Sequence, residues 1–299
     1  MSYANLTGRI GRFCIALGVV SFSFCLAPAY AAPTQAQEAL VEQAVEDRLL
    51  ELSDESFTKG LEYYYSRHYQ EAIDCFNKAI AIKDDIPEYY ESRALAQYAI
   101  GVRLHREGTD EALENEALAV YQQAAESYTQ AIELNPENVL NYQGRGIVYT
   151  TMDKFDQALA DFNKAIELQP DSYSLYERRA IAYIDMGEYD KAKADLDKAS
   201  SLNPNDAHNQ YLRGVWLARQ GKNGEALVVF DELTKANKWM AEAWLQKAMV
   251  YEEVGQPLDA YFAYREFLGR DRENNPYTHK FAEERIKEIT KIDYSKFGN

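Results

Sequence analysis

The sequence predicts an all-α fold, a solenoid of about six helical hairpins. The first observation is a period of 34 residues, over which small, aromatic and proline positions recur. The second is that apolar residues within each period keep the 3.6-residue spacing of one helical face. The third is that glycine or proline stands at the expected ends of several helices, as at Gly187 and Pro170. A fixed period of this length is typical of stacked repeats, in which each unit packs only on its neighbours.

Residues 1–31 have the pattern of a secretory signal peptide. Arg9 and Arg12 precede an apolar run from Phe13 to Ala27, and Ala29-Tyr30-Ala31 places small residues where a signal peptidase cuts. The run is shorter than the roughly 20 residues needed to span a membrane. We therefore expect export to a bacterial periplasm, cleavage near Ala31 and no stable membrane span in the mature form.

Residues 32–52 are predicted to contain a short linker and an N-terminal capping helix. Residues 32–37 are the expected linker. Apolar residues then recur at helical spacing, which suits a helix that covers the first repeat. These residues are Val41, Ala44, Val45, Leu49 and Leu52.

Six repeats are predicted over residues 53–274, beginning near residues 53, 87, 139, 173, 207 and 241. The first helix of a repeat has a small residue at position 8, such as Gly146. The second helix has alanine at position 20 and an aromatic residue or leucine at position 24, such as Ala158 and Phe162. Small residues let the paired helices approach closely, and the large ones fill the groove beside them.

The second repeat contains 18 extra residues. Gly108 and Thr109 indicate a tight turn, and the segment from Glu111 to Glu114 restarts a helix earlier than the period requires. We expect a hairpin extended over residues 101–118, and a flexible loop is the alternative. Residues 275–299 are predicted to form a C-terminal capping helix and tail. The residues expected to cover the last repeat are Phe281, Ala282, Ile286 and Ile289.

The segment from Tyr142 to Pro170, YQGRGIVYTTMDKFDQALADFNKAIELQP, closely resembles the tetratricopeptide repeat. The resemblance extends over about residues 53–274 and is looser at both ends. In the fifth and sixth repeats, Lys238 and Arg272 stand where the family pattern has proline. It implies a right-handed superhelix whose first helices line a concave groove. In the family this groove usually binds a segment of another protein.

The charge of the chain argues against several classes of partner. There are 48 acidic and 32 basic residues, a net charge of −16. Residues 1–31 contribute two arginines and no acid, so the mature chain would carry −18. Such a surface repels phosphate backbones and anionic lipids, so we expect no nucleic acid and no peripheral membrane binding. Cys75 is the one cysteine after residue 31, which leaves no internal disulfide.

No catalytic or metal-binding pattern stands out. The four histidines are far apart in sequence and none has a partner at metal-ligand spacing. Gly144-Arg145-Gly146 resembles part of a phosphate-binding loop, but it lies where the repeat demands small residues, so we interpret it as packing. We expect a protein that is not an enzyme and that uses no cofactor or metal.

Helix geometry nominates residues for a concave binding face. If positions 4, 8 and 11 of each first helix pack inward, positions 2, 5, 9, 12 and 13 face the groove. With Arg178 at position 6 added, the candidates are Phe57, Leu61, Tyr64, Tyr65, Glu91, Leu95, Tyr98, Gln143, Ile147, Thr150, Glu177, Arg178, Ile181, Asp185, Tyr211 and Val215. Tyr64 and Tyr65 are the strongest, because Tyr63 and Tyr69 already supply the core positions of that repeat.

Two features of the candidate face remain ambiguous. The aliphatic residues at position 9 either anchor a partner or pack between adjacent first helices. Some relatives of the family clamp a carboxylate with basic residues, but here only Arg178 is basic at the corresponding positions, so a clamp is not expected. The basic residue at position 7 recurs too, and we predict that it bridges to acids on a neighbouring helix. Its instances are Arg93, Arg145, Arg179, Arg213 and Lys247.

The sequence thus favours a non-catalytic scaffold or adaptor of the bacterial envelope. Its partner would be a protein segment with apolar anchors and basic flanks, because the groove combines aliphatic and aromatic residues with acids. The alternative is a carrier of a small-molecule or lipid-like ligand in an apolar groove.

Overall fold

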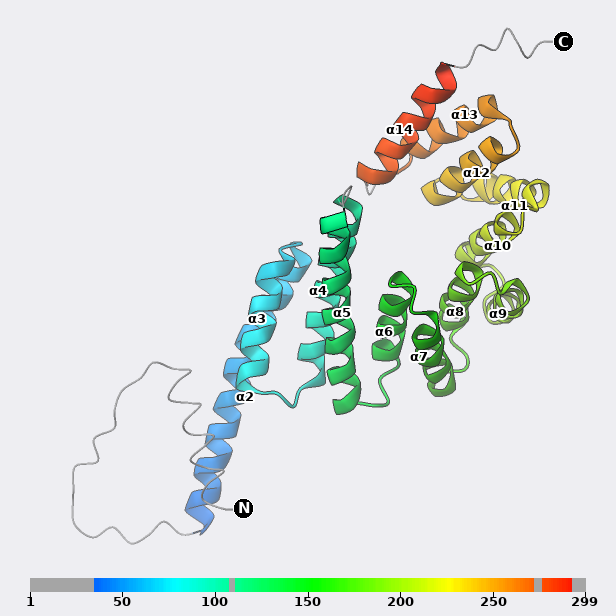
Figure 1. The fold of residues 1–299 in the computed structure, drawn as a ribbon. Helices are drawn as coiled ribbons and strands as arrows, with labels where there is room; N and C mark the ends of the chain where they lie inside the picture. The colour runs from blue at the N-terminus through cyan, green and yellow to red at the C-terminus, as the bar shows by residue number, and fades with distance from the viewer. Residues whose placement is uncertain (1–34, 108–110, 272–275, 292–299) are drawn as a thin grey trace, which may run out of the picture. The chain divides into compact units, whose positions relative to one another are not determined.

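A computed structural model describes residues 35–107, 111–271 and 276–291. Thirteen α-helices and no strand occur among these residues, so the all-α repeat fold is confirmed (Figure 1). The predicted signal peptide, the turn at Gly108 and Thr109, Arg272 and the tail beyond residue 291 lie outside the described residues. Within the described part of the chain, no helix is both long and apolar enough to cross a membrane.

The helices follow one another as antiparallel pairs joined by short turns. Their bounds are α2 Gln35–Tyr65, α3 Tyr69–Ile82, α4 Pro87–Glu107, α5 Glu111–Leu134, α6 Val139–Thr151, α7 Phe155–Leu168, α8 Tyr173–Asp185, α9 Tyr189–Leu202, α10 Ala207–Arg219, α11 Asn223–Ala236, α12 Ala241–Glu253, α13 Pro257–Leu268 and α14 Pro276–Thr290. The chain divides into two compact units, residues 1–96 and 97–299.

The first unit contains α2, α3 and the first half of α4. Its core is built on Phe76, which is fully buried. A Cβ atom at Gly60 would lie 2.5 Å from the Phe76 ring, so only glycine lets α2 approach α3 this closely. The Phe57 ring also packs there, with centroid distances of 5.7 Å to Phe76 and 4.8 Å to Tyr89.

Helix α2 differs from the predicted arrangement. It is one unbroken helix of 31 residues, which begins at Gln35 within the expected linker and continues through Ser53, the expected start of the first repeat. Residues 35–52 contain no glycine or proline and are rich in good helix formers, so nothing interrupts the helix. Val41 and Val45, expected to cover the first repeat, are 64% and 39% exposed and lie outside its core.

The second hairpin is longer than the others. Helices α4 and α5 contain 21 and 24 residues, whereas α6 and α7 contain 13 and 14. The described parts of residues 101–118 are therefore helical. Leu104 and Ala117 are buried, and the Tyr121 ring occupies the space that a side chain at Gly101 would need.

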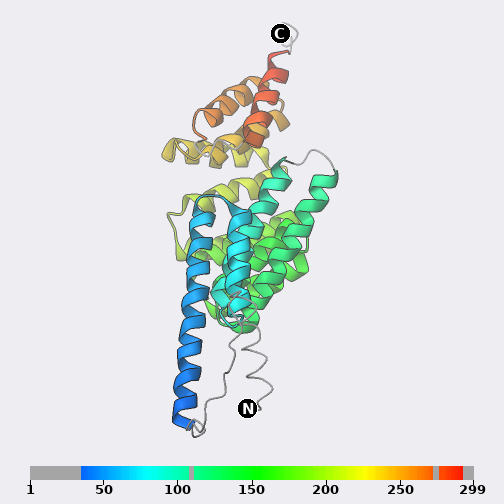
Figure 2. The same cartoon turned by 90° about the vertical axis from the view of Figure 1, so that its left-hand side faces the viewer.

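In the second unit, the first helices of successive repeats contact one another and each also packs on its own second helix. Gly146 lies against Phe162, and Gly214 lies against Phe230, as the small and large positions predict. Figure 2 shows the same hairpins from the side. Within this unit, the candidate positions 2, 5, 9, 12 and 13 of each repeat therefore lie on the layer formed by the first helices.

A left-handed residue ends the first helix of most repeats. Gly187, Gly221 and Gly255 have φ values of +77°, +73° and +72°. Arg67 and Asp153 hold the same position in their repeats, at +63° and +55°. The residue that follows donates its backbone N–H five positions back, as the Schellman motif requires.

Helix α14 packs on the last repeat. Ala282 and Ile289 are buried in a cluster with Tyr264 and Phe267, as expected for a helix that covers this end. Phe281 contributes less, because 37% of it is exposed while its ring meets Tyr264 edge-on at 6.1 Å.

Candidate partner-binding surface

Tyr65, at the end of α2, is the most exposed of the aromatic and aliphatic candidates. It is 80% exposed, and its ring lies edge-on to Tyr64 with centroids 5.6 Å apart. The Tyr64 ring in turn lies 5.6 Å from Tyr69 at the start of α3. Burial raises the pKa of Tyr64, and the neighbouring tyrosines raise it further. The half-buried Tyr64 thus holds an exposed aromatic ring in place.

Phe57 belongs to the core of the first repeat rather than to its surface. Its half-buried ring packs on Phe76 and Tyr89. The Tyr89 hydroxyl donates to the Asp54 carboxylate at 2.7 Å. Burial, with the Asp54 hydrogen bond, raises the pKa of Tyr89 to about 12, so this hydroxyl stays protonated and structural.

The other candidates of the first unit are half-buried or modestly exposed. Leu61 and Glu91 are half-buried, and Glu91 takes part in interactions with neighbouring groups. Leu95 is 38% exposed. None of these three presents as much free surface as Tyr65.

The aliphatic residues at position 9 of the second unit pack between helices. Ile147 lies against the cluster of Ala158, Phe162 and Ala182. Ile181 and Val215 are likewise half-buried against the next core clusters. Much of their apolar surface therefore joins adjacent repeats, which leaves little for a partner.

Polar candidates of the third repeat are partly satisfied within the chain. The Thr150 hydroxyl donates to the Gly146 carbonyl at 2.9 Å, inside its own helix. Gln143 is half-buried. Tyr98, in the extended hairpin, packs its ring on Tyr121 with centroids 5.6 Å apart.

Glu177 is a buried carboxyl group rather than a surface contact. It is only 4% exposed. Burial, together with the neighbouring Asp206 carboxylate, raises its pKa to about 7, while Asn209 and Arg178 act in the opposite direction. Asp206 accepts the Asn209 backbone N–H at 2.8 Å and so caps α10. Glu177 therefore lies at the interface between α8 and α10, beside the half-buried Arg178.

Tyr211 is also half-buried between repeats, while Asp185 is exposed. The Tyr211 ring stacks on His208 at 5.8 Å and lies 6.3 Å from Phe230. Burial raises the pKa of Tyr211 to about 12 and lowers that of His208. The half-buried Tyr211 and the exposed His208 thus form an aromatic pair on α10.

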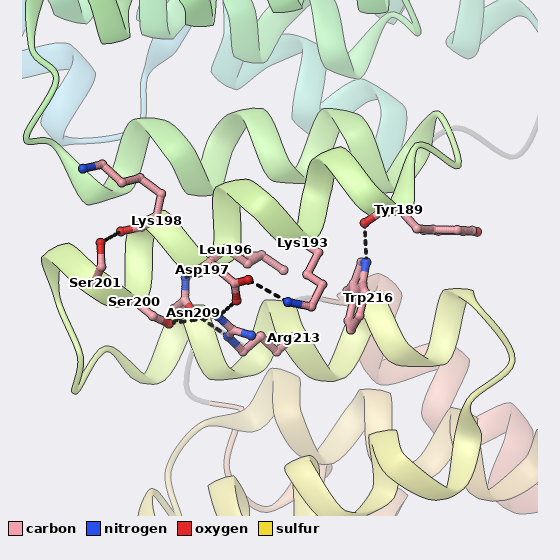
Figure 3. Close-up of polar contacts among 10 residues, drawn as sticks. All are labelled: Tyr189, Lys193, Leu196, Asp197, Lys198, Ser200, Ser201, Asn209, Arg213 and Trp216. Carbon is pink, nitrogen blue, oxygen red and sulfur yellow. Dashed lines mark hydrogen bonds and ion pairs between the residues drawn. The ribbon is translucent and has the colours of Figure 1, made fainter.

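A polar network between α9 and α10 was not predicted from the sequence (Figure 3). Asn209 is almost fully buried; it donates to the Leu196 carbonyl at 3.3 Å and accepts from Ser200 at 2.7 Å. The Trp216 indole donates to the Tyr189 carbonyl at 2.9 Å. An asparagine at position 3, where the preceding repeat has leucine, was the available signal.

The Gly144-Arg145-Gly146 segment is explained by packing, as predicted. A side chain at Gly144 would meet the Tyr128 ring, and one at Gly146 would meet Phe162. Among the described residues, no group of three or more His, Cys, Asp or Glu side chains is arranged to hold a metal ion. Cys75 is buried and free.

Comparison with known families assigns the repeats. Models described as tetratricopeptide repeat match residues 54–86, 142–172, 173–206 and 241–274. The chain is a tetratricopeptide repeat protein. The matched segments correspond to the last part of α2 with α3, and to α6 with α7, α8 with α9 and α12 with α13, so each match covers one helical hairpin.

Solved structures of other tetratricopeptide repeat proteins share the fold. PilW, described as a widely conserved type IV pilus biogenesis factor, aligns with a TM-score of 0.59 at 16% identity over 80% of this chain and 98% of its own. A tetratricopeptide repeat protein from Parabacteroides merdae aligns at 0.57 and 18% identity, over 82% and 94%. PilF of Pseudomonas aeruginosa aligns at 0.53 and 16% identity, over 78% and 98%. At these identities the likeness establishes the fold.

Proposed function

We propose that this tetratricopeptide repeat protein is a non-catalytic scaffold that binds a segment of a partner protein. The observation that carries the proposal is the tyrosine pair at the end of α2. Tyr65 is 80% exposed, and its ring packs edge-on against Tyr64, which in turn packs against Tyr69. An exposed ring on a rigid support loses little conformational freedom on binding, and tyrosine is enriched among residues that dominate interface energies.

The chemistry of the partner follows from charge. With a net charge of −16, the chain attracts basic sequences and repels acidic ones. The partner segment therefore carries an apolar or aromatic anchor that meets Tyr65 and basic residues beside it.

The bacterial envelope is the proposed location. This part of the proposal is supported by the pattern of residues 1–31 alone, with cleavage near Ala31. Mass measurement of the protein recovered from a bacterial periplasmic extract tests it. A mass that still includes residues 1–31 would contradict it.

The carrier alternative has less support. A carrier of lipid-like ligands needs an open apolar groove, whereas Ile147, Ile181 and Val215 pack on core clusters. Native mass spectrometry of the purified protein separates the two functions, because a carrier would retain a small ligand through purification.

Selection from a displayed library of short random peptides tests the scaffold proposal. We expect enrichment of basic peptides with aromatic or aliphatic residues, and a loss of about tenfold in affinity for them in Tyr64→Ala/Tyr65→Ala. Tyr173→Ala, which removes a tyrosine 37% exposed at the start of α8, is the matched control and should bind as the wild type does. Equal affinity in all three proteins, or no enrichment, would overturn the proposal.

A further inference from the structure

A second surface lies at the opposite end of α2, away from Tyr65. The Lys83 ammonium, just past the end of α3, lies 3.2 Å from the Glu46 carboxylate. The contact with Glu46 therefore marks how far α3 extends alongside α2. The eleven residues from Gln35 to Val45 continue beyond that point, roughly 16 Å of helix. Figures 1 and 2 both show this part of α2 extending past α3.

The extension presents apolar side chains to solvent. Leu40 is 71% exposed, Val41 64% and Val45 39%, and Ala44 between them is exposed as well. The spacing of these four residues places them along one side of the helix. We name them the α2 stripe. Among the residues that the structure describes, no other helix covers this stripe, and an exposed apolar stripe of this kind indicates a docking surface.

Charge decides which occupant fits. Residues 35–52 contain five carboxylates, Glu38, Glu42, Glu46, Asp47 and Glu51, against one basic residue, Arg48. Arg48 is already paired with Glu51. A second copy of the chain would bring the same negative charge against the stripe and would be repelled. A basic helix would place its cations against the flanking acids.

We propose that the α2 stripe docks an amphipathic helix of a partner protein, with aliphatic residues on one face and lysine or arginine on its flanks. Leu40, Val41, Ala44 and Val45 supply the i, i+1, i+4, i+5 contacts of a helix-to-helix seam. Because the segment continues an already formed helix, its backbone is helical before the partner arrives, which lowers the entropic cost of binding. This surface is separate from the tyrosine pair at Tyr64 and Tyr65.

The test uses two synthetic amphipathic helices as probes, one with leucines and lysines and one with glutamates in place of the lysines. Binding to the purified protein is followed by fluorescence anisotropy at about 0.15 M salt, which screens long-range attraction. We expect the lysine peptide to bind and the glutamate peptide not to bind. Leu40→Gln/Val41→Gln/Val45→Gln should weaken binding of the lysine peptide by about tenfold or more.

A matched control removes equal apolar exposure elsewhere without changing charge. Val228, Leu258 and Phe262 are 57%, 56% and 57% exposed on α11 and α13. The triple glutamine variant at these positions should bind the lysine peptide as the wild type does. If both triple variants weaken binding alike, or if neither does, attraction by general acidity explains the binding and the proposal is overturned.

Two further readouts keep the result unambiguous. Circular dichroism should show the same thermal transition in the α2 variant as in the wild type, because the three altered side chains are exposed and glutamine favours helix. Sedimentation velocity tests the other occupant: a dimer that Leu40→Gln/Val41→Gln/Val45→Gln dissolves would mean that a second copy covers the stripe, which would overturn the proposal of a basic partner.

Discussion

At the scale of single residues, the recurring cation at position 7 acts as a bridge. Arg145 donates from Nε and Nη2 to Asp161 at 2.8 and 2.7 Å, and from Nη1 to Thr129 at 2.9 Å. Arg179 makes the equivalent hydrogen bonds, from Nε and Nη2 to Asp195 and from Nη1 to Asn163. Each guanidinium therefore joins the second helix of its own repeat to the second helix of the repeat before. The predicted bridge to an acid on a neighbouring helix is thus confirmed for Arg145 and Arg179.

This bridge predicts the cost of losing one cation. Asp195 is 5% exposed, so Arg179→Met leaves its carboxylate buried without its partner. We expect the free energy of unfolding to fall by about 3–5 kcal/mol, and by less when Asp195→Ala is added, because the buried charge is then gone. Urea denaturation measures both. The control is Lys193→Met, which breaks an exposed ion pair with Asp197 and should cost less than about 1 kcal/mol. Equal losses in Arg179→Met and Lys193→Met would contradict the bridge.

Glu177 predicts a dependence of stability on pH. Its pKa is about 7 in the folded chain, against an ordinary value of 4.5, so the folded state binds this proton more tightly than the unfolded state. A raised folded pKa means that stability falls as pH rises between these two values and stays constant above them. Glu177→Gln removes this contribution. The free energy of unfolding of the variant should therefore rise relative to that of the wild type as pH rises from about 5 to about 8. Urea denaturation at both pH values measures the gain, and identical pH profiles would show that the carboxyl group is not responsible.

At the scale of helices, each hairpin depends on a glycine or alanine opposite an aromatic ring or leucine. Phe230 is fully buried, and a Cβ atom at Gly214 would lie 2.5 Å from its ring. The same relation holds for Gly146 with Phe162 and for Gly60 with Phe76. The pairing sets how closely the two helices approach, so it is the packing unit that the 34-residue period repeats.

The pairing predicts a contrast between two glycine substitutions in one repeat. Gly214→Ala should lower the free energy of unfolding by about 1–3 kcal/mol, because the buried Phe230 ring has to move. Gly224→Ala in α11 meets no atom within 4 Å and should raise it slightly, by up to about 1 kcal/mol, since alanine favours helix. Thermal unfolding followed by circular dichroism compares them. A loss in Gly224→Ala equal to that in Gly214→Ala would mean that helix approach is not the limiting contact.

Helix α2 shows where prediction at this scale fell short. Its helical character was predicted from the spacing of Val41, Ala44 and Val45, but its unbroken course through Ser53 was not. Helical spacing shows which residues share a face, and it carries no information on whether another helix covers that face. Val41, Ala44 and Val45 were therefore interpreted as part of a cap, whereas the structure leaves them exposed.

At the scale of the molecule, the chain is a series of similar hairpins in two compact units. Because each repeat packs on its neighbours alone, stability is nearly a sum of repeat and interface contributions. The candidate sites follow the same division. The tyrosine pair and the α2 stripe belong to the first unit, while most other groove candidates belong to the second and are half-buried between its helices.

The sequence by itself determined the repeat fold, the small and large positions of each hairpin and the structural role of the position-7 cations. These are encoded locally, because a helix stop or a small residue acts within one repeat and its nearest neighbour. Only the tertiary structure decided that Ile147, Ile181 and Val215 join repeats, that Glu177 is buried, and that Tyr65 and the α2 stripe are open. Exposure depends on which other helix lies against a face, and that is a property of the assembled chain.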